Sequence, residues 1–412
     1  MSNEKWTHSL SRMTEQDVET LRSYCNGYNY QGAGFTFLAN YIWRNDYDLN
    51  WEELDSYLMF ENVFRMEDGE QAGVFVMPLT KNGTYEKESL RRAILEGRKR
   101  FTEKGIPFSV RLVPGVLKET LQEAVPELEF EHDRDDDEYV YDRDKLTTLS
   151  GRALHKKKNH MNYFKKNFSY EAKPLTEDMK SEIIALTEMI RDGKERSDDE
   201  MRSLSEERHA IHEIMRFIDR EDVYSVGIFI DGRLQAYAIG ERMSEDTAAE
   251  HFEKANLQFR GLYQVVCSEF CKQLPEEIRF VNREEDMGLP GLRHAKEALK
   301  PHHMSEMYNA WFPEDREELL RMGLIGGQLE ERLQKQNEQS EAAAGGERPS
   351  NPSMNEDPLR TADDMIRRDA EEHERQETQK FQDHECGLLV PDSAGVCSHC
   401  AAEWTCSLVH TA

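Results

Sequence analysis

The chain has 412 residues, of which 38% are apolar and 33% charged, and its formal net charge is −28. A chain this acidic is not expected to bind DNA or RNA through its overall field, although a local basic patch can still contact RNA. No apolar run approaches the roughly 18 residues that predict a membrane-spanning helix, and the N-terminus lacks the apolar stretch of a signal peptide. We therefore expect a cytoplasmic protein whose seven cysteines are reduced.

Composition changes near the end of the apolar-rich region. Up to Trp311, apolar clusters recur at strand and helix spacing, whereas the chain beyond Pro313 is rich in Glu, Gln, Arg, Asp and Ser. Paired glycines and few large apolar residues in this second region are typical of disorder. We expect two folded domains over 1–145 and 146–312, an acidic disordered linker with marginal helices over 313–385, and a Cys-rich segment over 386–412.

The sequence of the first domain predicts a mixed α/β fold. Capping residues and helical or alternating apolar spacing predict its elements. In chain order these are a helix over Thr14–Tyr24, a buried aromatic stretch over Phe35–Trp43, strands over Leu58–Phe64 and Gly73–Met77, a helix over Ser89–Lys104 and a strand over Phe108–Val113.

The second domain is more regular. Its predicted elements are a basic helix over Gly151–Asn167, a strand over Phe168–Ala172, helices over Thr176–Arg191 and Ser205–Ile218, strands over Val223–Ile230, Leu234–Arg242 and Thr247–Lys254, a helix over Phe259–Gln273, a strand over Ile278–Asn282 and a helix over Pro290–Leu299. Asp231 and Gly232 separate two alternating apolar runs, which is a strong signal for a type I′ hairpin turn. This order is similar to the GNAT acyltransferase fold, and the first domain resembles a looser version of it. We therefore predict tandem GNAT-like domains, each a mixed, mostly antiparallel sheet flanked by helices.

Charged and amide side chains crowd the end of the predicted strand that finishes at Asn282. They occur in three segments, His251–Lys254, Gly261–Gln264 and Asn282–Lys296. Ends of strands and starts of helices are where ligands bind in open α/β sheets. Carboxylates can hold an amine, and arginine or lysine can hold a phosphate or a developing oxyanion. The alternative is an internal salt-bridge network that fixes the loop.

These segments, together with Phe35–Arg44, Asp137–Tyr141 and Leu149–His160, resemble the C-terminal domain of phosphatidylglycerol lysyltransferase, a branch of the GNAT superfamily with uncharacterised soluble members. The resemblance covers roughly residues 10–311. It implies a tandem GNAT-like fold with the active cleft in the second domain, and transfer of an aminoacyl group from aminoacyl-tRNA to an amine or hydroxyl acceptor. The lipid-modifying relatives carry a large transmembrane domain that this sequence lacks, which leaves the acceptor open.

Ester aminolysis needs a carboxylate for the acceptor and cations near the leaving oxygen. The predicted catalytic residues are Glu253, Glu285, Arg283 and Arg293. Asp286 is expected to hold a cationic aminoacyl side chain. The further predicted substrate-binding residues are Lys254, Gln264, Lys296, Lys157, Asn159 and His160.

Two other functions remain open at this point. A CoA-dependent GNAT N-acetyltransferase would hold pyrophosphate near Gln258 and Gly261, but Tyr263 replaces the small residue that this motif needs, so acetyl-CoA is disfavoured. A GNAT-like protein that only binds a ligand or partner is the other alternative. No cofactor is firmly predicted.

A local basic patch stands out from the acidic chain. It comprises the run Lys156–His160 with Lys165 and Lys166, and Tyr163 and Phe164 are interleaved with it. This pattern is typical of contact with an RNA backbone, here an aminoacyl-tRNA. The alternative is a solvated helix face that neutralises the acidic run Asp133–Glu138.

Four cysteines lie in the last 27 residues: Cys386, Cys397, Cys400 and Cys406. Clustered thiolates in the cytosol predict a small tetrahedral zinc site. A cysteine tail that binds no metal is the alternative.

Overall fold

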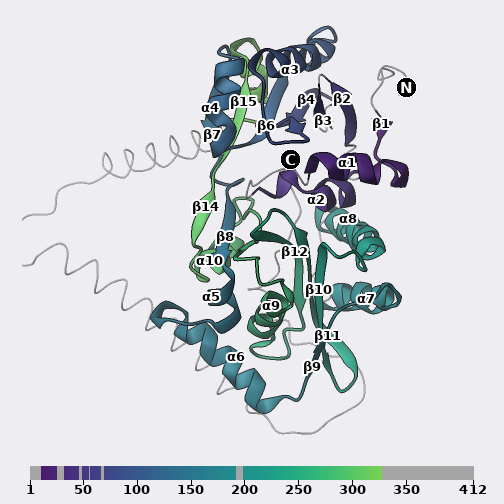
Figure 1. Cartoon of the computed structure of the whole chain (residues 1–412), viewed down its shortest axis with the longest axis vertical. Helices are drawn as coiled ribbons and strands as arrows, with labels where there is room; N and C mark the ends of the chain where they lie inside the picture. Colours follow the sequence, from purple (N-terminus) through teal and green to yellow (C-terminus); the bar gives the residue numbers. More distant parts are fainter. Residues whose placement is uncertain are drawn as a thin grey trace, which may run out of the picture. The chain divides into compact units, whose positions relative to one another are not determined.

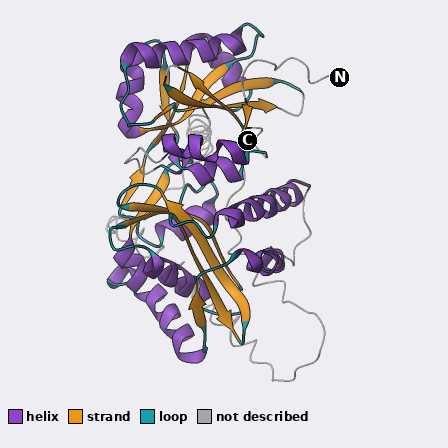
Figure 2. Cartoon of the chain, turned by 45° about the vertical axis from the view of Figure 1, so that its right-hand side comes forward, coloured by secondary structure: helices purple, strands orange, loops and turns teal. Residues whose placement is uncertain are grey.

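The computed structural model describes residues 11–25, 32–45, 49–54, 56–65, 69–191 and 198–326. These residues form two mixed β-sheets, each flanked by helices (Figures 1 and 2). The strands of the first sheet are, in spatial order, β1 (Ser11–Arg12), β2 (Asn50–Leu54), β3 (Tyr57–Arg65), β4 (Gln71–Val76), β6 (Phe108–Pro114), β15 (Met307–Trp311) and β7 (Glu129–His132), with β5 (Leu79–Thr80) paired to β3. The strands of the second sheet are, in spatial order, β14 (His303–Ser305), β8 (Glu138–Asp142), β13 (Phe280–Asn282), β12 (Thr247–Ala255), β11 (Arg233–Arg242), β10 (Val223–Ile230) and β9 (Glu171–Lys173).

All but the last of the described helices lie between these strands in the chain. The helices are α1 (Val18–Cys25), α2 (Phe37–Ile42), α3 (Lys87–Thr102), α4 (Gly115–Ala124), α5 (Arg143–Thr148), α6 (His155–Asn167), α7 (Lys180–Arg191), α8 (Asp198–Ile214), α9 (Leu262–Gln273), α10 (Pro290–Glu297) and α11 (Arg316–Arg321). Within the described ranges, no helix is both long and apolar enough to cross a bilayer.

The two sheets are built on one plan. The elements from β1 to β8 and those from β9 to β15 follow the same order: one strand, two helices, three antiparallel strands, one helix, one strand, one helix and two strands. The short β5 is the one strand added to this order in the first repeat. In each repeat the third strand of the meander pairs in parallel with the strand after the next helix: β4 with β6, and β12 with β13. The predicted tandem α/β architecture is therefore confirmed.

The repeats exchange their last strands. β8, the last strand of the first repeat, lies between β13 and β14 of the second sheet, and β15 lies between β6 and β7 of the first sheet. All four pairings are antiparallel. The sequence order did not reveal this exchange, because a short strand carries no mark of the sheet that it joins.

Local sequence explains the most regular part of the second sheet. Asp231 and Gly232 connect β10 and β11 and both have positive φ, 50° and 75°, as a type I′ turn requires. Every residue of β10 is buried, which fits a strand covered on both faces. The predicted hairpin is confirmed.

The fold continues past Pro313, where the sequence led us to begin the linker. Leu319, Met322, Leu324 and Ile325 are buried in a small cluster with Trp311. The rest of the predicted linker, with the four predicted zinc-ligand cysteines, lies outside the described residues.

Gly97 allows α3 to pack closely on the first sheet. A Cβ at this position would lie 1.9 Å from Cε2 of Phe75, which is fully buried. We expect Gly97→Ala to lower the free energy of unfolding by about 1–3 kcal/mol because Phe75 must move within a filled core. Gly291→Ala is the matched control, since nothing lies within 4 Å of its added methyl group. Urea denaturation of both variants checks this, and equal stability of the two would contradict the packing argument.

Candidate active site

Strand β13 pairs with only the first part of β12. The pairing stops at Ala249 and Asn282, although β12 continues to Ala255. Past Asn282 the chain follows β8 instead, since the N–H of Arg283 donates to the carbonyl of Tyr139 at 2.9 Å. The two parallel strands therefore diverge, and a cavity of about 120 Å³ lies where they separate. We call it the β12–β13 cavity.

Charged and polar side chains from several elements line this cavity. They are Lys157 of α6, Glu250, His251 and Glu253 of β12, Tyr263, Gln264 and Cys267 of α9, Arg283, Glu284 and Glu285 after β13, and Lys296 of α10. Leu149, Met287, Leu292, Ala295 and Leu299 complete the lining. Six of the predicted site residues thus lie around one cavity: Glu253, Glu285, Arg283, Gln264, Lys296 and Lys157.

A β-bulge in β12 determines which side of the sheet the carboxylates of Glu250 and Glu253 face. Ile239 of β11 pairs with Phe252 and Gly240 pairs with Glu250, so His251 is the extra residue. Strand residues three positions apart normally face opposite sides of a sheet. The extra residue brings Glu250 and Glu253 to the same side, where both form ion pairs with Arg283.

Arg283 lies between these two carboxylates. Its Nη2 is 3.0 Å from Oε1 of Glu253, and its Nε makes a close ion pair with Glu250. Burial raises the pKa of Glu250 to about 8, although Arg283 opposes the shift. Oε2 of Glu253 is buried and has no hydrogen-bond partner in the described part of the chain. The carboxylate of Glu253 is part of the cavity lining, but this oxygen is itself buried.

The segment after β13 places Glu285 between two cavities. Glu284 and Met287 have positive φ, 60° and 53°, and the N–H of Glu284 donates to Oδ1 of Asn282 at 2.7 Å. Glu284 and Glu285 also line a second cavity of about 190 Å³, which includes Asn40, Trp43 and Arg111 of the first repeat. Burial, then the neighbouring Glu284, raises the pKa of Glu285 to about 7.

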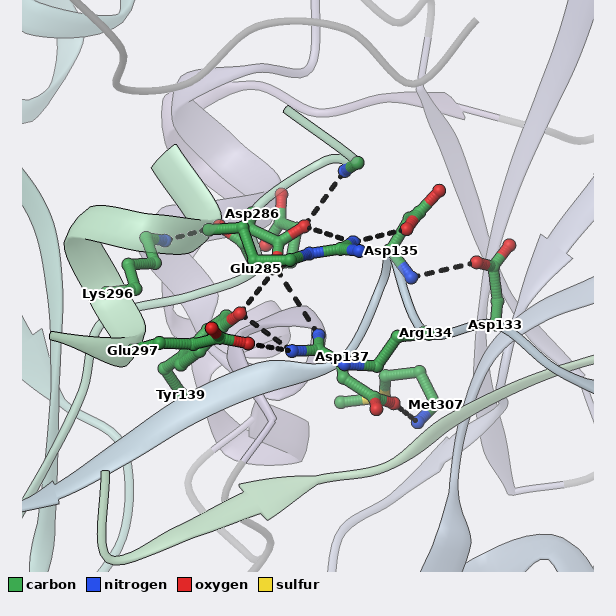
Figure 3. A network of polar contacts seen from close by, with 12 residues as sticks. Asp133, Arg134, Asp135, Asp137, Tyr139, Glu285, Asp286, Lys296, Glu297 and Met307 are labelled. Carbon is green, nitrogen blue, oxygen red and sulfur yellow. Dashed lines mark hydrogen bonds and ion pairs between the residues drawn. The ribbon is translucent and has the colours of Figure 1, made fainter. Parts of the chain in front are cut away.

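Two lysines supply further positive charge. Nζ of Lys296 donates to the carbonyl of Glu285 (Figure 3). It also donates to the carbonyl of Arg283 at 2.6 Å, and the two bonds fix the loop around the cavity. Lys157 reaches the cavity from α6. Burial lowers the pKa of both ammonium groups.

Comparison with known proteins shows to which family the chain belongs. Residues 26–311 match the family described as phosphatidylglycerol lysyltransferase, C-terminal, which is more than half of the chain. The chain belongs to this family. No curated protein matches it significantly.

Solved structures of other proteins share the fold of this chain. A conserved protein of unknown function from Bacteroides thetaiotaomicron VPI-5482 is 25% identical, with a TM-score of 0.65 over 74% of this chain and 99% of that chain. L-PGS from Bacillus licheniformis is 13% identical, with a TM-score of 0.51 over 74% and 94%. FemX is 10% identical, with a TM-score of 0.51 over 76% and 99%. The last two likenesses show the fold alone.

Two predicted site residues lie outside the cavity lining and pair with each other. Arg293 donates to both oxygens of the fully buried Asp286, at 2.8 and 2.9 Å. Asp286 also accepts from the hydroxyl of Tyr139 at 2.5 Å and forms an ion pair with Arg134 at 3.3 Å (Figure 3). Burial raises the pKa of Asp286, but the hydrogen bonds from Arg293 and Tyr139 outweigh it and hold the pKa below its ordinary value. This network holds the loop that follows β13 on β8.

The remaining predicted residues are also outside the lining. Lys254 forms a 2.7 Å ion pair with the buried Glu207. Asn159 is exposed on α6 and contacts His155. The carbonyl of His160 packs against Gly261, where a Cβ would lie 2.1 Å from that oxygen. No group of ligand residues suited to a metal is present among the described residues.

Sequence reasoning missed Glu250 because strand alternation places it opposite Glu253, and no local signal marks the bulge. It also missed the role of His251. This buried ring contacts Oε1 of Glu241 at 3.1 Å and Oε1 of Glu284 at 2.8 Å. Burial alone would lower the pKa of His251, but the two carboxylates outweigh it and raise the pKa to about 10. The imidazolium therefore ties β11 to the loop after β13.

We expect His251→Gln to destabilise the protein by about 3–5 kcal/mol near pH 6, because two buried carboxylates lose their cation. The folded-state pKa lies above the unfolded value of about 6.5, so this contribution is complete below pH 6.5 and is lost as pH rises towards 10. The difference in unfolding free energy between wild type and variant should therefore shrink from pH 6 to pH 10. A difference that grows with pH would contradict a charged His251.

Proposed function

We propose that this protein is an acyltransferase that moves an aminoacyl group from aminoacyl-tRNA to an amine or hydroxyl acceptor in the β12–β13 cavity. The observation that carries the proposal is Glu285, a carboxyl group with a pKa near 7 at the boundary of two cavities. A general base works best when its pKa is close to the working pH. Membership of the lysyltransferase family supports the same reaction class.

The proposed aminoacyl transfer can be carried out by a few side chains of the cavity lining. The acceptor nitrogen or oxygen attacks the ester carbonyl and gives its proton to Glu285. The bond between the carbonyl carbon and the ribose oxygen then breaks, and the leaving oxygen takes a proton from Lys157, whose pKa is lowered by burial. Arg283 and Lys157 stabilise the negative charge that develops on the carbonyl oxygen. Glu253, whose carboxylate is part of the cavity lining, holds the aminoacyl ammonium group.

The two cavities suggest separate approaches for donor and acceptor. The donor ester occupies the β12–β13 cavity, where Lys157 and Arg283 lie. The acceptor enters from the second cavity, whose wall includes Asn40, Trp43 and the Arg111–Asp136 ion pair at 3.2 Å. Glu284 and Glu285 are shared by both linings, so a base at Glu285 faces both substrates.

The packing near Gly261 argues against CoA as the donor. A pyrophosphate would need backbone amides at the start of α9, approached past a small residue. At Gly261 the carbonyl of His160 lies against the glycine, 2.1 Å from the position of an added Cβ, so this glycine is required for the packing of α6 and need not mark a pyrophosphate site. Tyr263 lies two residues further on and lines the cavity.

We expect Glu285→Gln to lower the transfer rate by about 10²–10⁴-fold, because the amide cannot take up a proton. The wild-type rate should rise through about pH 7, since Glu285 is protonated below its pKa. The measurement is loss of label from tRNA charged with a mixture of radiolabelled amino acids, in the presence of phosphatidylglycerol vesicles and a free amine, after subtraction of spontaneous hydrolysis.

Glu297→Gln is the matched control. Glu297 lies on α10, is half exposed and is not in the cavity lining. The transfer rate of the Glu297→Gln variant should therefore match that of the wild type. A Glu285→Gln variant as active as the control would refute the assigned base. Absence of any enzyme-dependent loss of label from the charged tRNA would favour a ligand-binding protein without catalysis.

A further inference from the structure

The second cavity, whose lining includes Glu285, occupies in the first repeat the place that the β12–β13 cavity occupies in the second. Parallel pairing begins at Phe108 in β6 and at Phe280 in β13. Three residues later, the chain places Arg111 in the second cavity and Arg283 in the β12–β13 cavity. The next residue has a positive φ in both repeats, 52° and 60°. The second cavity is therefore a repeated feature of the fold, built at the end of the first parallel pair.

Acidic side chains outnumber basic ones around the second cavity. Its lining holds four carboxyl groups, those of Asp136, Glu138, Glu284 and Glu285. Among the described residues of this lining, Arg111 is the one arginine or lysine. Its guanidinium already has partners, since it forms an ion pair with Asp136 at 3.2 Å and donates to Oδ1 of Asn309 at 3.3 Å. The lining therefore offers negative charge to a ligand and keeps its positive charge for the fold.

Glu138 and Glu285 carry most of this negative character. The donors to Glu138 are neutral, the N–H of Ala33 and the side-chain amide of Asn282. The ammonium group of Lys296 lowers the pKa of Glu285 but donates to backbone carbonyls. Burial, then the charge of Glu285, raises the pKa of Glu138 well above its ordinary value. An ammonium ion between these two groups would relieve their repulsion, whereas a phosphate would add to it.

The remaining walls of the second cavity are mainly apolar. They are formed by Ala33, Ala39, Trp43, Leu49, Phe64, Val74, Val76 and Leu112, with the amides of Asn40 and Asn62. Trp43, Leu49 and Val74 are buried, so this part of the wall is set in the core of the first repeat. The cavity measures about 190 Å³. An apolar cavity of about 150 Å³ can hold benzene. The space therefore fits a compact apolar group of about the size of one aromatic ring.

We propose that the second cavity binds the acceptor as a primary ammonium ion on a compact apolar body, so that the product is an amide. This inference rests on the proposed function and narrows its acceptor from an amine or hydroxyl to an amine. Glu138 and Glu285 hold the ammonium group, and the walls at Trp43 and Val76 hold the apolar body. The head group of an anionic lipid does not fit this lining, because its phosphate would meet carboxyl groups and a guanidinium that is already paired.

The protons of this reaction balance through residues already placed at the site. The bound ammonium ion gives one proton to Glu285, which releases it to solvent. The free amine then attacks the ester carbonyl and gives a second proton to Glu285 as the bond to the ribose oxygen breaks. Lys157 protonates the leaving oxygen, and both residues return to their starting states by exchange with solvent. An ammonium ion and an ester thus become an amide, a ribose hydroxyl and one released proton.

The first test is isothermal titration calorimetry of the full-length wild-type protein near pH 7 with three ligands of similar shape. Phenethylamine is cationic, 2-phenylethanol is neutral and 3-phenylpropanoate is anionic. Phenethylamine should bind at least about tenfold more tightly than 2-phenylethanol, because hydrogen bonds between charged groups are stronger than those between neutral groups. 3-Phenylpropanoate should bind most weakly. Equal affinities for the three ligands, or tightest binding of the anion, would overturn the inference.

Two valine variants locate the bound amine. Val76 lines the second cavity and not the β12–β13 cavity, so Val76→Phe reduces the space for the apolar body. It should weaken phenethylamine binding at least about tenfold. The matched control is Val116→Phe on α4, at a valine that is 72% exposed, which should bind as the wild type does. Unchanged affinity in Val76→Phe would place the amine elsewhere and overturn the inference. Glu285→Gln is a second variant, which should weaken phenethylamine binding about tenfold and leave 2-phenylethanol binding unchanged.

A transfer assay separates this inference from the proposed function. Wild-type protein with radiolabelled aminoacyl-tRNA should move label to phenethylamine and not to phosphatidylglycerol vesicles. Label on phosphatidylglycerol but none on phenethylamine would overturn this inference and leave the proposed transferase intact. Binding of the amine requires no chemistry. Tight phenethylamine binding that Val76→Phe abolishes, without any transfer from charged tRNA, would therefore support the amine site and reject the proposed function alone.

Discussion

The site depends on the hydrogen bonds that hold the segment after β13 on β8. Because Arg283 and Tyr139 pair through their backbones, the chain leaves β12 at Asn282, and no strand among the described residues pairs with the later part of β12 on that side. The unpaired edge is where Glu250 and Glu253 meet Arg283. β8 itself comes from the first repeat, so the exchange of strands creates the cavity of the second.

The same exchange makes the first repeat part of the site. Glu138 at the start of β8 accepts from the N–H of Ala33 at 2.8 Å and from the side chain of Asn282. Glu241 accepts from the N–H of Leu38 and contacts His251. Buried hydrogen bonds to charged groups are costly to leave unmade, so these contacts fix the loop geometry from both repeats. A single repeat would lack the contacts of Ala33, Leu38 and Glu138 that help to place the loop with Glu285.

Sequence alone predicted the elements with strong local signals. The Asp231–Gly232 turn, the long amphipathic α3 and the apolar strands β10 to β12 were predicted, because turn chemistry and periodicity are local properties. The charged segments around β12, α9 and the end of β13 were also predicted as a site, and six of the predicted site residues line one cavity. The sheet to which β8 and β15 belong depends on contacts distant in sequence. The bulge at His251 and the pairing of Arg293 with Asp286 join residues that are close in sequence, but they depend on side-chain and register details that spacing alone does not show. No local pattern encodes them.

The central claim is that the β12–β13 cavity receives the aminoacyl end of the donor. A crystal structure with a 3′-aminoacylamino-adenosine, in which a stable amide replaces the ester, tests it most directly. The account predicts that the aminoacyl group lies between Glu253 and Lys157, with its carbonyl facing Arg283 and Glu285. The account would be contradicted if the analogue bound in another part of the protein while this cavity contained only solvent.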